Sequence, residues 1–113
     1  MKLITIDIKS EQQTVAQAIA EFLIEIDSCK VGGFKVMKVI HGYGSHGKGG
    51  TIKQELLKTC KNLKNKKIIE DFVCCDQWTD KSITRKIAIN YCPDLIADQE
   101  LNHLNPGCSI III

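Results

Sequence analysis

Hydrophobic residues recur along the chain with two periods, one typical of strands and one typical of helices. Leu3 to Ile8, Phe34 to Ile40 and Ile68 to Cys75 are short apolar runs, and each predicts a strand. Between these runs, apolar residues recur every three or four positions. This spacing predicts a helix of about twelve residues beginning at Val15 and a second helix beginning near Thr51. The order strand–helix–strand–helix–strand favours parallel strands joined by helical crossovers.

Capping patterns accompany both predicted helices. Thr14 and Gln17 have the spacing of a capping box, in which each side chain bonds the backbone amide of the other residue. Thr51 and Gln54 repeat that spacing at the second helix. Residues 62–67 are rich in lysine and predict a basic connector before the third strand.

The last third of the chain predicts short helices and a fourth strand. Apolar residues fall four apart from Ile83 to Tyr91, and residues 98–103 favour a further helical turn. Cys108 to Ile113 is apolar on both faces, which is typical of a strand in the interior of a sheet. We therefore predict one α/β domain over residues 1–113, a two-layer α/β sandwich with a four-stranded mixed sheet.

A glycine-rich loop follows the second predicted strand. Five of the nine residues from Gly42 to Gly50 are glycine. Glycine lets main-chain N–H groups approach a ligand closely, and a helix N-terminus adds further unpaired N–H groups. Because His41, His46 and Lys48 lie in the same segment, the favoured ligand is a phosphate. We expect residues 41–50 to form an exposed loop.

Two nucleotide-binding motifs compete for this loop. Gly42, Gly44 and Gly47 satisfy G-x-G-x-x-G, but a chain of 113 residues is too short for both halves of a dinucleotide-binding fold. Gly47-Lys48 nearly completes a P-loop, although Gly49 stands where the Mg²⁺-binding serine or threonine should be. A nucleotide-binding protein that uses the G-x-G-x-x-G loop remains an alternative.

Charge is distributed unevenly along the chain. The formal net charge is only +2, yet residues 28–68 contain ten lysines and a single acid, Glu55. The segments on either side are acidic. A basic excess around a phosphate-type loop suits a polyanion better than one small nucleotide, so nucleic acid is the favoured partner.

Cysteine spacing and hydropathy argue against a secreted, a metal-binding and a membrane protein. The six cysteines contain no C-x-x-C pair, and no signal peptide is recognisable. We therefore expect reduced thiols that fill the core, and neither disulfides nor a metal site. No segment approaches the roughly 18 apolar residues of a membrane span, so we expect a cytoplasmic protein without membrane contact. The cysteines are Cys29, Cys60, Cys74, Cys75, Cys92 and Cys108.

The order of elements and the glycine loop together resemble the small MutS-related (Smr) domain family, whose signature is an apolar strand running into His-Gly-x-Gly. Here that motif is Ile40-His41-Gly42-Tyr43-Gly44. The family's first motif, Leu-Asp-Leu-His-Gly, aligns with Ile6-Asp7-Ile8-Lys9-Ser10, where lysine replaces the histidine and serine the glycine. Residues 105–109 and the isoleucines after them look like the family's final strand. The segment 78–104 is longer than in the minimal domain.

The resemblance implies a domain that binds DNA or RNA, with endonuclease activity in parts of the family. The candidate catalytic residues are His41, Asp7 and Lys9, and the cofactor is left open, with Mg²⁺ a candidate. Lys9 moves no proton near neutral pH without a large fall in its pKa. The resemblance therefore supports binding more than cleavage, and a catalytically inactive binding module of the same fold is an alternative.

Residue chemistry suggests a role for each candidate. His41 has the pKa range of a general acid or base, or it braces the loop through a backbone carbonyl. Asp7 could orient a base, hold a metal or cap the first helix. Lys48 could neutralise a phosphate, and Tyr43 could stack on a base. The candidate nucleic-acid-binding residues are Gly42, Tyr43, Gly44, Gly47, Lys48 and Lys53.

Overall fold

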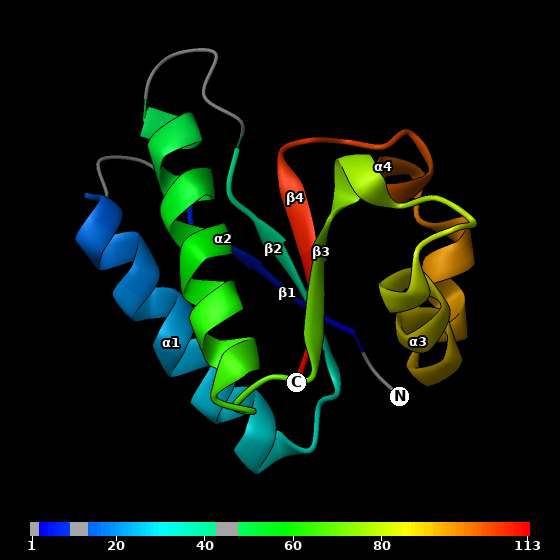
Figure 1. Cartoon of the computed structure of the whole chain (residues 1–113), viewed down its shortest axis with the longest axis horizontal. Helices are drawn as coiled ribbons and strands as arrows, with labels where there is room; N and C mark the ends of the chain where they lie inside the picture. Colours follow the sequence, from blue (N-terminus) through cyan, green and yellow to red (C-terminus); the bar gives the residue numbers. More distant parts are fainter. Residues whose placement is uncertain (1–2, 10–13, 43–47) are drawn as a thin grey trace.

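The computed structural model of the chain describes residues 3–9, 14–42 and 48–113 and forms an α/β domain (Figure 1). Its elements are β1 (Leu3–Asp7), α1 (Val15–Gly32), β2 (Val36–Ile40), α2 (Lys48–Asn65), β3 (Asp71–Cys74), η1 (Cys75–Gln77), α3 (Ile83–Tyr91), η2 (Pro93–Ala97), α4 (Gln99–Asn102) and β4 (Cys108–Ile112).

The four strands form one mixed sheet in the order β1-β2-β4-β3. β1 pairs with β2 in parallel, whereas β4 is antiparallel to both of its neighbours, β2 and β3. Every residue of β4 is buried, which confirms the prediction that this strand lies inside the sheet. β3 therefore pairs with β4 rather than with β2, so only one neighbouring pair of strands is parallel.

Helices cover both faces of the sheet (Figure 1). Side chains of β4 alternate between the two sides. Ile111 packs into the core under α1 and α2, while Ile110 and Ile112 pack into a second core with the segment from η1 to α4. The sheet and the two long helices, α1 and α2, form the two layers that the sequence predicts. The short helices between β3 and β4 add a cover on the opposite face.

The first helix begins where the sequence predicts and ends later. The Thr14 amide lies 2.9 Å from Gln17 Oε1, and the Gln17 amide lies 3.1 Å from Thr14 Oγ1, so the predicted capping box is confirmed. The helix continues to Gly32 and is 18 residues long, longer than the twelve or so predicted. Gly33 ends it with a φ of 76°, a left-handed conformation that glycine adopts without strain.

The second helix corrects two predictions. α2 begins at Lys48, so Thr51 lies inside the first turn and the capping box predicted there is wrong. The helix also continues to Asn65, because lysine is a good helix former, and most of the predicted basic connector is helical. The chain then turns through Lys67, with a φ of 61°, and β3 begins only at Asp71.

Candidate functional site

His41 follows the last residue of β2 and is fully buried. Its ring Nδ1 lies 2.6 Å from the carbonyl oxygen of Gly42, and its Nε2 lies 2.8 Å from Ser109 Oγ. A carbonyl only accepts hydrogen bonds, so Nδ1 carries the proton and Nε2 accepts from the Ser109 hydroxyl. The backbone amides of His41 and Gly42 both donate to the carbonyl of Gly107, at 2.9 and 3.0 Å.

Burial lowers the pKa of His41, and the charge of Lys53 acts in the same direction. The hydrogen bond to the Gly42 carbonyl opposes this shift without reversing it. The imidazole is therefore neutral at pH 7. This geometry is that of the loop-bracing histidine, one of the two roles predicted. A proton-transfer role requires one ring nitrogen to exchange its present partner for substrate.

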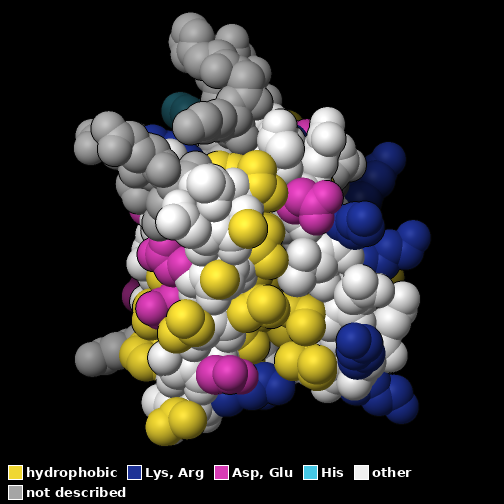
Figure 2. Space-filling view, turned by 90° about the vertical axis from the view of Figure 1, so that its left-hand side faces the viewer, with side chains coloured by type: hydrophobic (Ala, Val, Ile, Leu, Met, Phe, Trp, Pro, Cys, Tyr) yellow, Lys and Arg dark blue, Asp and Glu magenta, His cyan; other side chains and the backbone are white. Residues whose placement is uncertain are grey.

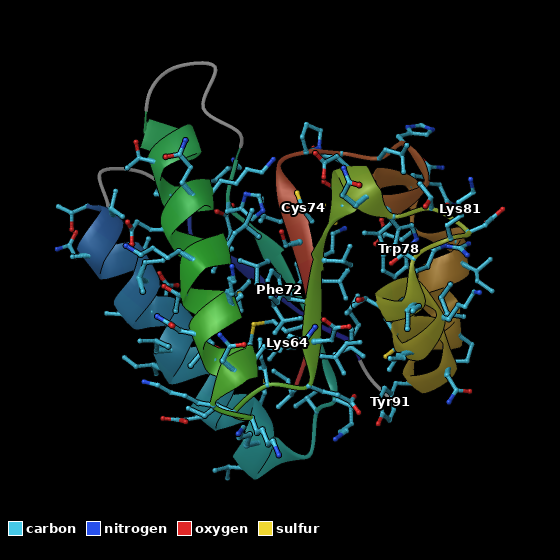
Figure 3. The ribbon with its side chains drawn as sticks, in the orientation of Figure 1. Lys64, Phe72, Cys74, Trp78, Lys81 and Tyr91 are labelled. Carbon is cyan, nitrogen blue, oxygen red and sulfur yellow. The ribbon has the colours of Figure 1, made fainter. Side chains whose placement is uncertain are left out.

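Several polar groups meet at the same end of the sheet as the His41 ring. Ser109 on β4 pairs in register with Cys74 on β3, and Figure 3 shows Cys74 at this end. From α2, Lys53 Nζ lies 4.0 Å from Asp76 Oδ2 in η1. Ser109 was not predicted as part of the site. Its signal in the sequence is a hydroxyl at the start of an isoleucine-rich strand, and in the structure this hydroxyl is the partner of His41 Nε2, while the Gly42 carbonyl fixes the tautomer.

Asp7 and His41 lie on opposite faces of the sheet. Ile6 packs into the core under α1 and α2, so the alternation of β1 directs Asp7 to the other face. Ser109 lies on the α2 side, because its neighbour Ile110 packs into the opposite core, and the His41 ring lies against Ser109. Asp7 is exposed, and its Oδ1 accepts a hydrogen bond from the Lys9 amide at 2.9 Å.

The candidate binding residues are only partly described. Gly42 has a φ of 72°, which accounts for glycine after His41. Lys48 opens α2, and the side chain of Lys53 is 20% exposed. The expectation of an exposed loop from His41 to Gly50 is wrong at both ends, since His41 is buried and Lys48 to Gly50 is helical. Tyr43, Gly44, His46 and Gly47 lie outside the described residues.

α2 carries lysines along its whole length, from its start near this end of the sheet to Lys64, which pairs with Asp71 at the other end. α2 contains five lysines and one acid, Glu55. Two of the lysines have acidic partners, since Lys64 Nζ lies 3.0 Å from Asp71 Oδ1 and Lys53 approaches Asp76. Lys58 and Lys61 are exposed, and within the described part of the chain no ion pair engages them. Lys66 and Lys67 extend the exposed charge beyond the helix.

The described ranges contain neither a cluster of metal ligands nor a helix that could span a membrane. No group of three or more His, Cys, Asp or Glu side chains there is arranged to hold a metal ion. All six cysteines carry thiols and are buried, which confirms their role as small core residues. None of the described helices is both long enough and apolar enough to cross a bilayer.

Comparison with known proteins identifies the fold. The chain is similar to the crystal structure of the Smr domain of Thermus thermophilus MutS2, with a TM-score of 0.57 and 16% sequence identity over 96% of this chain and 95% of that chain. No protein-family model matches the sequence, and no curated protein matches it. The likeness therefore concerns the fold, which the order of strands and helices had predicted. In fold, the chain is an Smr-like domain.

Proposed function

We propose that this chain is a nucleic-acid-binding domain of the Smr type that contacts backbone phosphates through α2 and the lysines after it. The observation that carries the proposal is the charge of α2, which has five lysines and one acid. Ammonium groups spaced along an exposed helix suit a run of phosphates better than a single nucleotide. The likeness in fold to the Smr domain of MutS2 supports the same proposal.

The glycine loop contributes a second set of contacts in this proposal. Backbone amides of Gly44 and Gly47 approach one phosphate, and Lys48 neutralises its charge. Gly42, whose amide donates to Gly107, gives the chain its turn into the loop. Tyr43 stacks on a neighbouring base. The N-terminus of α2 begins at Lys48, so the helix dipole and the loop amides favour an anion at the same place.

The proposal concerns binding of nucleic acid, and it expects little or no cleavage. His41 is buried with both ring nitrogens hydrogen-bonded, and Asp7 faces the other side of the sheet. Lys9 stands where the family has its first histidine. A general acid or base typically contributes roughly 10²- to 10⁴-fold to a rate, so a chain without that histidine should bind nucleic acid and cut it weakly or not at all. Any endonuclease activity would depend on His41.

The test measures binding and cleavage on the same molecules. Labelled single-stranded and duplex DNA and RNA are titrated with protein between about 50 and 200 mM salt. Replacing Lys61 and Lys66 by glutamine should weaken binding and reduce the salt slope by about one for each lost phosphate contact. A second pair, Lys48→Gln with Lys53→Gln, tests the loop end of α2 in the same way.

The matched control is the pair Lys81→Gln with Lys86→Gln, on the segment that covers the opposite face of the sheet. Figure 3 shows Lys81 on that side. The control should leave affinity and salt slope unchanged. With Mg²⁺ present, Lys9→His should raise cleavage without changing affinity, and His41→Ala should abolish it. Salt-independent binding, or tight ATP or NAD binding at the loop, would instead favour the nucleotide-binding alternative.

A further inference from the structure

α1 is apolar on the side that faces the sheet and also on the side that faces away from it. Its inner stripe is buried and consists of Ala18, Phe22, Ile26 and Cys29. On its outer side, Leu23, Ile24 and Val31 are 39%, 64% and 92% exposed. Exposed apolar side chains that lie together on a surface are typical of a protein-binding site, so this outer surface suits a protein partner.

The apolar surface is hollowed rather than flat. One hollow of about 640 Å³ lies between α1 and α2, and a second of about 450 Å³ lies towards the end of α1. Figure 2 views the molecule from this side and shows apolar side chains gathered between acidic ones and a row of lysines and arginines. The first hollow is lined by Val15, Ala16, Ile19, Ala20, Leu23, Thr51 and Glu55, and the second by Ile24, Asp27, Ser28, Val31 and Gly32.

The two helices bordering the larger hollow are matched in length and opposite in charge. Each is 18 residues long. α1 contains three acids and one lysine, whereas α2 contains five lysines and one acid. The two helices lie side by side and run in the same direction along the sheet (Figure 1). The surface is therefore complementary to itself, provided that α1 of one copy meets α2 of another.

We propose that a second copy of this chain covers the surface formed by α1 and α2. A two-fold axis running along the helices places α1 of each copy on α2 of the other, so that acids face lysines around an apolar centre. The perpendicular two-fold would place α2 on α2 and oppose the lysines. The inference does not rest on the proposed function, because it starts from the exposed apolar residues of α1 and from two hollows that contain no lysine, although both proposals use lysines of α2.

Sedimentation equilibrium on the full chain tests the dimer. We expect a reversible monomer–dimer equilibrium for the wild type. Ile24→Glu and Val31→Glu should each weaken it by roughly tenfold or more, because each places a charge in the apolar centre. Ile83→Glu is the matched control, since Ile83 is 71% exposed on α3, over the opposite face of the sheet. The exposure of all three positions keeps the fold intact, and circular dichroism checks this.

Cross-linking tests the arrangement of the two copies. A carbodiimide joins carboxylates to lysines that touch, and a mixture of ¹⁴N- and ¹⁵N-labelled protein identifies the links formed between copies. We expect mixed-isotope links between peptides of α1 and α2. A wild type that stays monomeric at high concentration and low salt would overturn the proposal. So would a dimer that Ile24→Glu and Val31→Glu leave unchanged, or one whose links between copies exclude α1 paired with α2.

Discussion

At the scale of single residues, His41 has both ring nitrogens and its backbone amide hydrogen-bonded. Its ring and backbone connect the end of β2 to Gly107 and Ser109 at the start of β4. The imidazole is neutral in the folded protein, because burial lowers its pKa below the value of an exposed histidine. The unfolded chain therefore binds a proton at His41 more readily than the folded chain does.

This difference predicts acid sensitivity. Above about pH 6.5 both states are neutral at His41, whereas below it only the unfolded state gains a proton, so stability falls as the pH falls. We expect His41→Gln to remove this part of the pH dependence and to lower the free energy of unfolding at neutral pH by about 1–3 kcal/mol through lost hydrogen bonds. Urea unfolding between about pH 7.5 and pH 5.5 measures both effects. His103→Gln is the control, because His103 is exposed; an unchanged pH slope in His41→Gln would contradict the prediction.

Among the elements, α4 is attached to the sheet through a buried lysine as well as through Leu101 in the core. Lys38 on β2 has a side chain 7% exposed, and its Nζ lies 2.9 Å from Asp98 Oδ2 and 2.6 Å from Glu100 Oε1. Burial acts to lower the pKa of Lys38, but hydrogen bonds to the two carboxylates outweigh it and raise the pKa. Lys38 is therefore charged throughout the neutral range, and its loss would leave two acids beside each other.

We expect Lys38→Met to reduce the free energy of unfolding by about 1–3 kcal/mol. This loss of stability should be smaller than that from breaking a fully buried ion pair, because the side chains of Asp98 and Glu100 are 18% and 46% exposed. The matched control is Lys64→Met, which breaks an ion pair to Asp71 whose lysine side chain is 50% exposed. That change should cost less than about 1 kcal/mol in denaturant titrations. Equal losses for the two variants would show that the Lys38 cluster does not hold α4.

The elements also show what the sequence can predict. Periodicity located all four strands and the longer helices, because each buries a regular apolar stripe. The boundaries of α2 were harder to predict. Thr51 has the spacing of a cap, yet α2 extends back through two glycines to Lys48, against their low helix propensity. The separation of His41 from Asp7 depends on the register of β1 and β2, in which Asp7 pairs with Ile40, and the sequence alone does not give that register.

For the whole molecule, the two faces of the sheet are covered unequally. α1 and α2 are each 18 residues long, whereas α3, η2 and α4 contain 9, 5 and 4 residues. Short helices have few internal hydrogen bonds and are marginal on their own, so the segment between β3 and β4 should open at a lower free energy than the long helices. Cysteines lie in the cores on both faces of the sheet, so their reactivity can show which face opens first. Cys29 and Cys60 lie in the core under α1 and α2, and Cys75, Cys92 and Cys108 lie in the opposite core.

Alkylation of the native protein, followed by peptide mapping, should therefore modify the cysteines in two groups. Burial raises the pKa of Cys60 to about 12, and a hydrogen bond with Cys108 together with burial raises the pKa of Cys75, so each thiol reacts only after the core around it opens. We expect Cys75, Cys92 and Cys108 to react before Cys29 and Cys60, and all six thiols to react at once in denaturant. Lys38→Met should accelerate only the first group, because it releases α4 from the sheet. A single rate for all five thiols would mean that the protein opens as one unit, and the unequal covers would then not differ in stability.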